Sequence, residues 1–161
     1  PEAFPEVPQV LERLQGAGLK TVILSNGTPS MLEAAVKHAG LGDLLDAVLS
    51  VESVGVFKPH PKVYTLAAER LNVAASAIAF QSSNAWDAHA ASAFGMRVVW
   101  CNRYGQRPER LPGTPLSRDL DPGRASTAGR RLAGKQQPDR NPWRAKERSG
   151  THPPSISGRP L

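Results

Sequence analysis

Three short polar clusters in the sequence each follow a largely apolar run. They are Ser25-Asn26-Gly27, Lys58-Pro59 and the stretch from Ser82 to Asp87. Their hydroxyl, amide and ammonium groups supply hydrogen-bond donors and positive charge, which is the chemistry that binds a small anion. Asp87 is the only carboxylate in these clusters, and it could pair with Lys58. Taken together, the clusters favour a functional site that accepts an anion.

The chain around these clusters alternates between strand-like and helix-like patterns. The expected strands are at residues 21–24, 47–51, 77–81 and 97–101, and the expected helices are at 6–17, 29–39, 61–71 and 85–94. This alternation is typical of an α/β fold with a parallel sheet. The apolar, β-branched run at 21–24 also predicts a strand buried on both faces. Ligands bind beyond the carboxyl ends of parallel strands, so all three clusters lie where the fold predicts a site.

Each cluster also has a simpler structural interpretation. Ser25 or Asn26 could cap the following helix, Lys58 could be a solvated surface residue, and Asp87 could favour the positive end of a helix dipole. Only the coincidence of all three favours a site. For His60 and His89 we favour structural roles, because His60 lies between two prolines and His89 lies on a helix.

The charge is unevenly distributed along the chain. The net charge is +6 over 161 residues, but residues 1–104 hold 8 Lys and Arg against 9 Asp and Glu, whereas residues 105–161 hold 12 against 5. A basic tail could bind nucleic acid. Trp143 is its only tryptophan and no aromatic residues are interleaved with its charges, so specific nucleic-acid recognition is disfavoured.

The cysteine count and the hydropathy bear on location. Cys101 is the single cysteine, so an intramolecular disulfide is impossible, which fits a reducing cytoplasm. We expect Cys101 to be a buried structural thiol. No apolar run approaches the roughly 18–20 residues that would span a bilayer, so no membrane partner is expected.

Composition divides the chain into two parts. Residues 1–115 are expected to form the α/β core, and residues 116–161 a low-complexity basic tail that is disordered. Pro and Gly make up 16 of the 57 residues from 105 to 161, and large apolar residues are sparse there. Beyond Leu120 the composition, rich in Arg, Gly, Pro and Ser, resembles translation in a shifted reading frame, which is a hypothesis from composition alone.

The order and spacing of the clusters resemble a known superfamily. Ile23 to Gly27, Val56 to Tyr64 and Ser82 to Asp87 resemble the second, third and fourth motifs of the haloacid dehalogenase superfamily. Within it, Ser-Ser-Asn-x-x-Asp resembles the type II (S)-2-haloacid dehalogenases. The segment Trp100-Cys101-Asn102-Arg103 resembles a strand and turn of the same enzymes, and the likeness extends over residues 1–115. The resemblance implies a Rossmann-like core.

This resemblance also implies a reaction and a set of residues. An aspartate would displace halide from an (S)-2-haloacid, and water would hydrolyse the ester to a 2-hydroxyacid. Lys58 would hold the nucleophile, the other catalytic residues would arrange water and pair with Lys58, and no metal or cofactor would be needed. The implied catalytic residues are Lys58, Ser82, Asn84 and Asp87, and the implied substrate-contacting residues are Ser25, Asn26, Tyr64 and Trp86. A homodimer is common in the family.

The sequence departs from the family in one important respect. The first motif, roughly Asp-x-Tyr/Asp-Gly-Thr, which carries the nucleophile, is not found in residues 1–161. We therefore expect the C-terminal fragment of a longer enzyme, missing the first strand and the helical cap domain, and inactive by itself.

Three other functions remain open. A Mg²⁺-dependent phosphatase of the same superfamily is disfavoured because Ser82-Ser83 stand where an acid would bind the metal. The second is a non-enzymatic module with a nucleic-acid-binding tail. The third is a truncated, frameshifted product without function.

Overall fold

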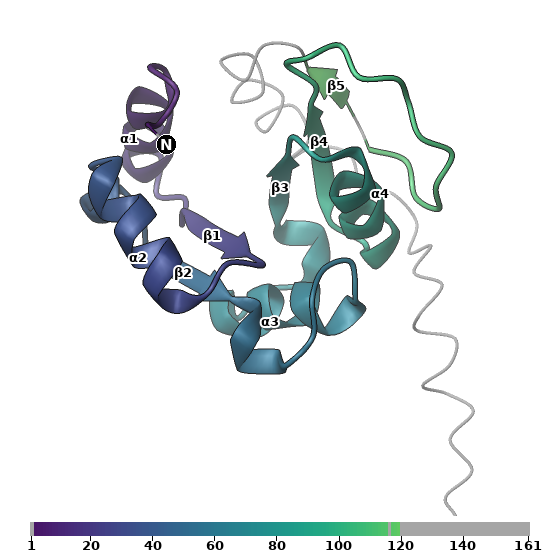
Figure 1. The fold of residues 1–161 in the computed structure, drawn as a ribbon, viewed down its shortest axis with the longest axis horizontal. Coiled ribbons are helices and arrows are strands. Elements are labelled where there is room, and N and C mark those ends of the chain that lie inside the picture. The colour runs from purple at the N-terminus through teal and green to yellow at the C-terminus, as the bar shows by residue number, and fades with distance from the viewer. Residues whose placement is uncertain (1, 116, 120–161) are drawn as a thin grey trace, which may run out of the picture.

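The fold is known from a computed structural model that describes residues 2–115 and 117–119 (Figure 1). Its helices are α1 (Val7–Gly16), α2 (Pro29–His38), α3 (Pro61–Leu71) and α4 (Ala85–Phe94). Its strands are β1 (Val22–Ser25), β2 (Ala47–Ser50), β3 (Ala79–Ser82), β4 (Arg97–Cys101) and β5 (Ser117–Asp119). Short 3-10 turns lie at Gly42–Leu44, Val51–Val54 and Ala75–Ala77. Every predicted helix and strand is present, with ends shifted by at most two residues.

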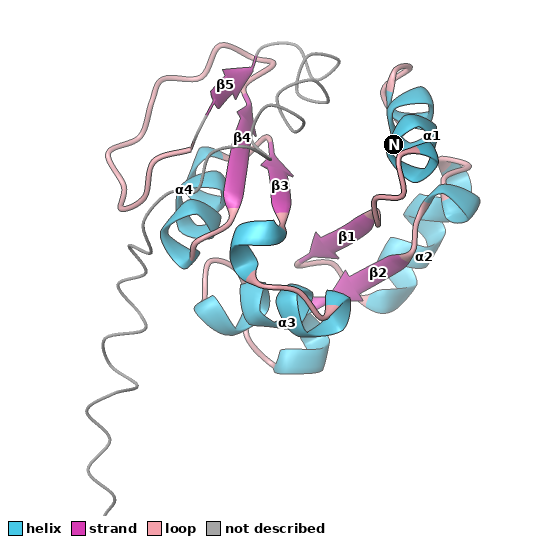
Figure 2. Ribbon diagram, turned by 180° about the vertical axis from the view of Figure 1, so that it is seen from behind, coloured by secondary structure: helices cyan, strands magenta, loops and turns pink. Residues whose placement is uncertain are grey.

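All strand pairs are parallel, which confirms the predicted α/β class. β1 pairs with β2 so that Ser25 lies opposite Ser50, and β3 pairs with β4 so that Ser82 lies opposite Trp100. The described strands form two sheets, β1-β2 and β3-β4-β5, which are separate in Figure 2. Within the described residues, β1 and β3 therefore each have one edge without a partner strand.

The prediction that the first strand is buried on both faces is wrong. Val22 to Ser25 are all only partly buried. β1 is hydrogen-bonded on one side only, which leaves much of its surface uncovered by described residues. The adjacent Thr21 is buried, and its hydroxyl donates to the Leu44 carbonyl at 2.6 Å.

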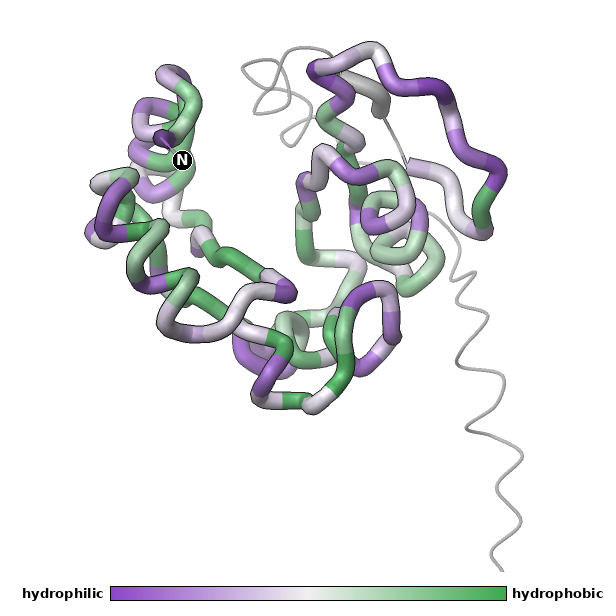
Figure 3. Tube along the Cα trace, viewed as in Figure 1, coloured by the Kyte–Doolittle hydropathy of each residue, from purple (hydrophilic) through white to green (hydrophobic). Residues whose placement is uncertain are grey.

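The main core lies between α3, α4 and the β3-β4 pair. Ala85, Ala88 and Ala91 recur at intervals of three residues, so they share one face of α4 and allow the helix to lie close to the sheet. Trp100 and Tyr64, each 1% exposed, are among the largest side chains buried in this core. In Figure 3 the strands are largely apolar, whereas the long loop after β4 is mostly hydrophilic.

That loop returns across α4 to reach β5. His89 Nδ1 and the Gly113 carbonyl oxygen are 2.7 Å apart, and the Ser92 hydroxyl donates to the Thr114 carbonyl at 2.8 Å. Gly113 has a φ of +86°, and a Cβ there would lie 2.3 Å from the His89 carbonyl oxygen, so only glycine fits this contact.

β5 lies beyond the domain boundary predicted at residue 115. It aligns Val99 with Ser117 and Cys101 with Asp119. A Ser-Arg-Asp strand has no apolar or β-branched residue to signal it, so composition alone did not reveal it. The rest of the predicted tail, 120–161, lies outside the described residues.

The segment before α1 is fastened to the turn after β4. The Arg103 guanidinium forms an ion pair with the Glu6 carboxylate and lies 3.8 Å from the centroid of the Phe4 ring. The hydrogen bond from Arg103 holds the pKa of Glu6 below its usual value.

None of the helices in the described part of the chain is long and apolar enough to cross a membrane.

Candidate active site

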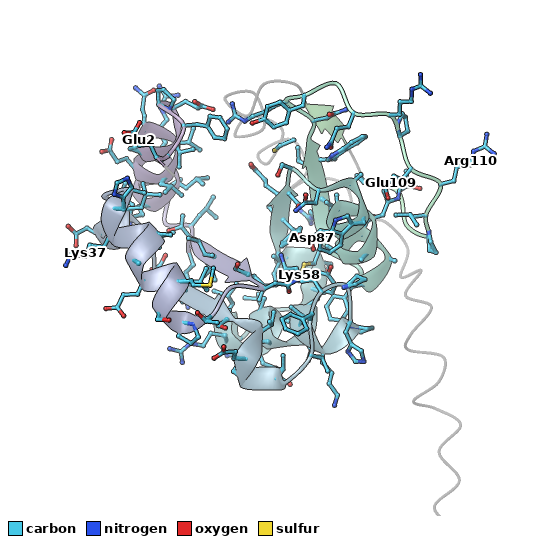
Figure 4. The ribbon with its side chains drawn as sticks, viewed as in Figure 1. Glu2, Lys37, Lys58, Asp87, Glu109 and Arg110 are labelled. Carbon is cyan, nitrogen blue, oxygen red and sulfur yellow. The ribbon has the colours of Figure 1, made fainter. Side chains whose placement is uncertain are left out.

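Asp87 lies at the centre of a buried hydrogen-bond network. It sits in the first turn of α4, directly after β3, and is 3% exposed. Its carboxylate accepts hydrogen bonds from Lys58 Nζ at 2.9 Å, Tyr64 Oη at 2.8 Å and Ser82 Oγ at 3.0 Å. Figure 4 shows Lys58 and Asp87 pointing toward one another. Four of the residues singled out in the sequence thus meet at one point.

Lys58 reaches this point from the loop between β2 and α3. Its side chain is only 8% exposed, so the solvated-surface interpretation is wrong. Nζ lies 5.0 Å from the centroid of the Phe80 ring, and the Lys58 backbone N–H donates to Asn26 Oδ1 at 2.9 Å. A buried ammonium is tolerated because a carboxylate and an aromatic face both balance its charge.

The turn after β1 is held by hydrogen bonds of its own. Ser25 Oγ accepts from the Gly27 backbone N–H at 3.1 Å, and the Ser50 hydroxyl donates to the Gly27 carbonyl at 2.8 Å. Thr28 caps α2 by accepting from the Met31 N–H at 3.3 Å. The helix cap is therefore neither Ser25 nor Asn26.

Asn84 and Trp86 lie at the more exposed side of the network. The Asn84 backbone N–H donates to Ser82 Oγ at 3.2 Å, and the Asn84 side chain does not cap α4. Trp86 is 36% exposed. In the described part of the chain, neither side chain forms a hydrogen bond with Asp87, so both residues lie beside the network rather than within it.

His60 and Cys101, also considered in the sequence, have structural roles. His60 caps α3 by accepting from the Lys62 N–H at 3.2 Å, and Cys101 is buried within β4 at 8% exposure, as expected. Phe80 is the participant that sequence reasoning missed. It lies two residues before Ser82 on β3, and this spacing places both side chains on one face of the strand.

Burial changes the acidity of Tyr64. Burial, followed by the hydrogen bond and the charge of Asp87, raises the pKa of Tyr64 above its usual value. In the unfolded chain this phenol ionises near pH 10, whereas in the folded chain it stays protonated to higher pH. The stability contributed by the protonated phenol is therefore present below pH 10 and is lost as the pH rises.

Relative to Tyr64→Phe, the unmodified chain should lose about 1.4 kcal/mol of unfolding free energy between pH 9 and pH 11. Urea unfolding at both pH values would check this, and equal losses in the two proteins would contradict it.

The network consists of one ammonium and two hydroxyl groups around a single carboxylate. Asp87 already accepts three hydrogen bonds. Within residues 2–115 and 117–119 there is no group of three or more His, Cys, Asp or Glu side chains that could hold a metal ion. Mg²⁺ prefers several free oxygen ligands, and Asp87 is the single carboxylate of this network. The arrangement can instead hold one fixed ammonium beside hydroxyl groups at the carboxyl ends of the strands.

Proteins with similar sequences and structures point in one direction. The chain is 50% identical over 112 residues to an (S)-2-haloacid dehalogenase from Pseudomonas sp. strain YL, a match that covers 70% of this chain and 48% of that enzyme. The crystal structure of the L-2-haloacid dehalogenase RSc1362 matches with a TM-score of 0.77 and 43% identity, covering 80% of this chain and 57% of that one.

A third match carries a covalent adduct. It is the L-2-haloacid dehalogenase from Xanthobacter autotrophicus with chloropropionic acid covalently bound, with a TM-score of 0.74 and 35% identity, covering 79% of this chain and 60% of that one.

The chain spans about half the length of the curated relatives it matches. A family model described as haloacid dehalogenase-like hydrolase matches residues 1–95. That match extends from the segment before α1 through the Lys58–Asp87 network to the end of α4, and the chain belongs to the haloacid dehalogenase-like hydrolases.

Proposed function

We propose that this protein hydrolyses (S)-2-haloacids to 2-hydroxyacids and halide. The observation that carries the proposal is the buried Lys58–Asp87 pair at 2.9 Å, which fixes an ammonium where the strands end. Two relatives whose names or titles specify haloacid dehalogenases, at 50% and 43% identity, support this substrate class.

The proposed chemistry has two steps. A carboxylate oxygen attacks the α-carbon of the haloacid, the carbon–halogen bond breaks, and halide leaves with the bonding electrons. Water then attacks the carbonyl carbon of the ester, the acyl–oxygen bond breaks, and the products are the 2-hydroxyacid, the free carboxylate and one proton. We place the nucleophilic carboxylate in a segment outside residues 1–161.

The residues of this chain act around that nucleophile. Lys58 holds and orients the carboxylate by charge, and Asp87 holds the Lys58 ammonium in place. Ser82 and Asn84 arrange the hydrolytic water, and Tyr64, which donates to the other oxygen of Asp87, lines the substrate site.

The remaining proposed residues face the substrate. Ser25, the last residue of β1, and Asn26, which follows it, bind the haloacid carboxylate or the departing halide. Trp86 contributes apolar surface beside the halogen-bearing carbon, which its exposure of 36% permits.

Chloride release from (S)-2-chloropropionate tests the function. The protein would be expressed from the start codon of its gene and assayed with EDTA present, alongside its Lys58→Met variant. Chloride release by the parent and a loss of about a hundred- to a thousandfold in the variant are expected, because the buried ammonium that orients the nucleophilic carboxylate is removed. Phosphate release from a phosphoester on addition of Mg²⁺, without chloride release, would instead assign a phosphatase.

The proposal extends to location and assembly. A cytoplasmic location is supported by the single cysteine, which needs no oxidising compartment. A homodimer follows from the family resemblance, and light scattering at several protein concentrations would measure it.

A further inference from the structure

Lys58 is held at its two ends by groups from different parts of the fold. Its backbone N–H donates to Asn26 Oδ1 at 2.9 Å, and its Nζ donates to Asp87 Oδ2 at 2.9 Å. Asn26 directly follows β1, whereas Asp87 lies in the first turn of α4, the helix that comes after β3. Since β1 and β3 are not paired with each other among the described strands, Lys58 connects the carboxyl ends of the two sheets.

The acceptor on Asn26 is carried by a well-defined turn. The next residue, Gly27, is held through its N–H by Ser25 Oγ and through its carbonyl by the Ser50 hydroxyl. A Cβ on Gly27 would lie 3.1 Å from Leu32 Cδ2, so the turn also packs tightly against α2. Asn26 itself is exposed, but the residue that follows it is held on both sides of its peptide group.

The two ends of the Asn26 amide have different tasks. Oδ1 is committed to the Lys58 backbone, whereas Nδ2 donates no hydrogen bond to any described residue. The carbonyl end can therefore position Lys58 while the NH₂ end remains available to the substrate.

We propose that Asn26 is a positioning residue that fixes the Lys58 backbone through its side-chain carbonyl. The contact orients the start of the lysine side chain, and Asp87 orients its end, so that the ammonium has a single location. The importance of that location for catalysis rests on the proposed function, but the anchoring contact does not.

Amide hydrogen exchange at Lys58 tests the anchor directly. In ¹⁵N-labelled protein, Asn26→Ala removes the acceptor, and Lys58 N–H exchange should become about three- to tenfold faster, the range expected for one hydrogen bond. Asn26→Asp keeps an oxygen acceptor and should retain the parental rate. Glu33→Ala, on the exposed side of α2, is the matched control. Unchanged exchange at Ala88 and Val98 in the core would separate local release from loss of fold.

Chloride-release kinetics, measured in the protein expressed from the start codon of its gene, then separate positioning from binding. Both Asn26 variants lose the NH₂ donor and should raise KM. Only Asn26→Ala should also lower kcat, by about ten- to a hundredfold, because only it leaves Lys58 misplaced. Unaltered Lys58 exchange in Asn26→Ala, or equal loss of kcat in both variants, overturns the positioning role. If Lys58 exchanges faster in Asn26→Ala but the parent protein itself releases no chloride, the positioning role of Asn26 stands and only the proposed function is overturned.

Discussion

Replacing Asp87 with asparagine should destabilise the folded chain by about 3–5 kcal/mol. The Asp87 side chain is 4% exposed and the Lys58 side chain 8% exposed, so the change leaves a buried ammonium without its counter-charge. The carboxylate also accepts from Tyr64 and Ser82, and an amide has only one oxygen to serve three donors. The free energy of unfolding from urea titration at neutral pH is the measurement.

Two companion variants sharpen this test. Asp43→Asn alters an exposed carboxylate and should change stability by less than about 0.5 kcal/mol. Lys58→Met combined with Asp87→Asn removes both charges and should recover much of the loss, because no unpaired ion then remains buried. A cost below about 1 kcal/mol for Asp87→Asn, or no recovery in the double variant, would show that the pair is not buried as described.

Trp100→Ala should be similarly damaging, at about 3–5 kcal/mol. Trp100 is 1% exposed in the core between β4 and α4, and its indole N–H donates to the Ser83 carbonyl at 3.2 Å. The substitution removes a large apolar volume and the donor that holds the chain just before Asn84. Chemical unfolding monitored by circular dichroism would measure the loss.

Trp86→Ala is the matched control for this substitution. Trp86 lies in α4, whereas Trp100 lies in β4, and Trp86 is 36% exposed, so its truncation should cost about 1 kcal/mol or less. Equal losses for the two tryptophans would contradict the core assignment. Trp100→Phe should fall between them, since it keeps most of the volume and loses the hydrogen bond.

Local signals explain how much of the fold could be predicted from sequence. Pro29 and Pro61 stand at the starts of α2 and α3, and Gly95, with a φ of +110°, ends α4. Each acts within its own turn, so its effect can be predicted without knowing the rest of the fold. The meeting of Lys58 with Asp87 was predictable for a related reason, because parallel strands bring their carboxyl ends to one edge.

The features that could not be predicted depend on contacts with the backbone. The Asn26 carbonyl binds the Lys58 N–H, a group that every residue except proline possesses, so no pattern of side chains marks it. β5 is likewise formed by backbone pairing of polar residues. The partial exposure of Ile23 depends on what lies beside β1, which the β-branched run itself cannot report.

The crossover from β4 to β5 has a consequence for how the chain can vary. Parallel neighbours are commonly joined by a helix, but here an exposed loop makes the connection while α4 already covers the face. Residues 104–112 are all exposed and bury no core, so insertions and deletions there should accumulate freely during divergence. Gly113, which packs against the His89 carbonyl, should by contrast stay glycine and mark the end of the variable part of the loop.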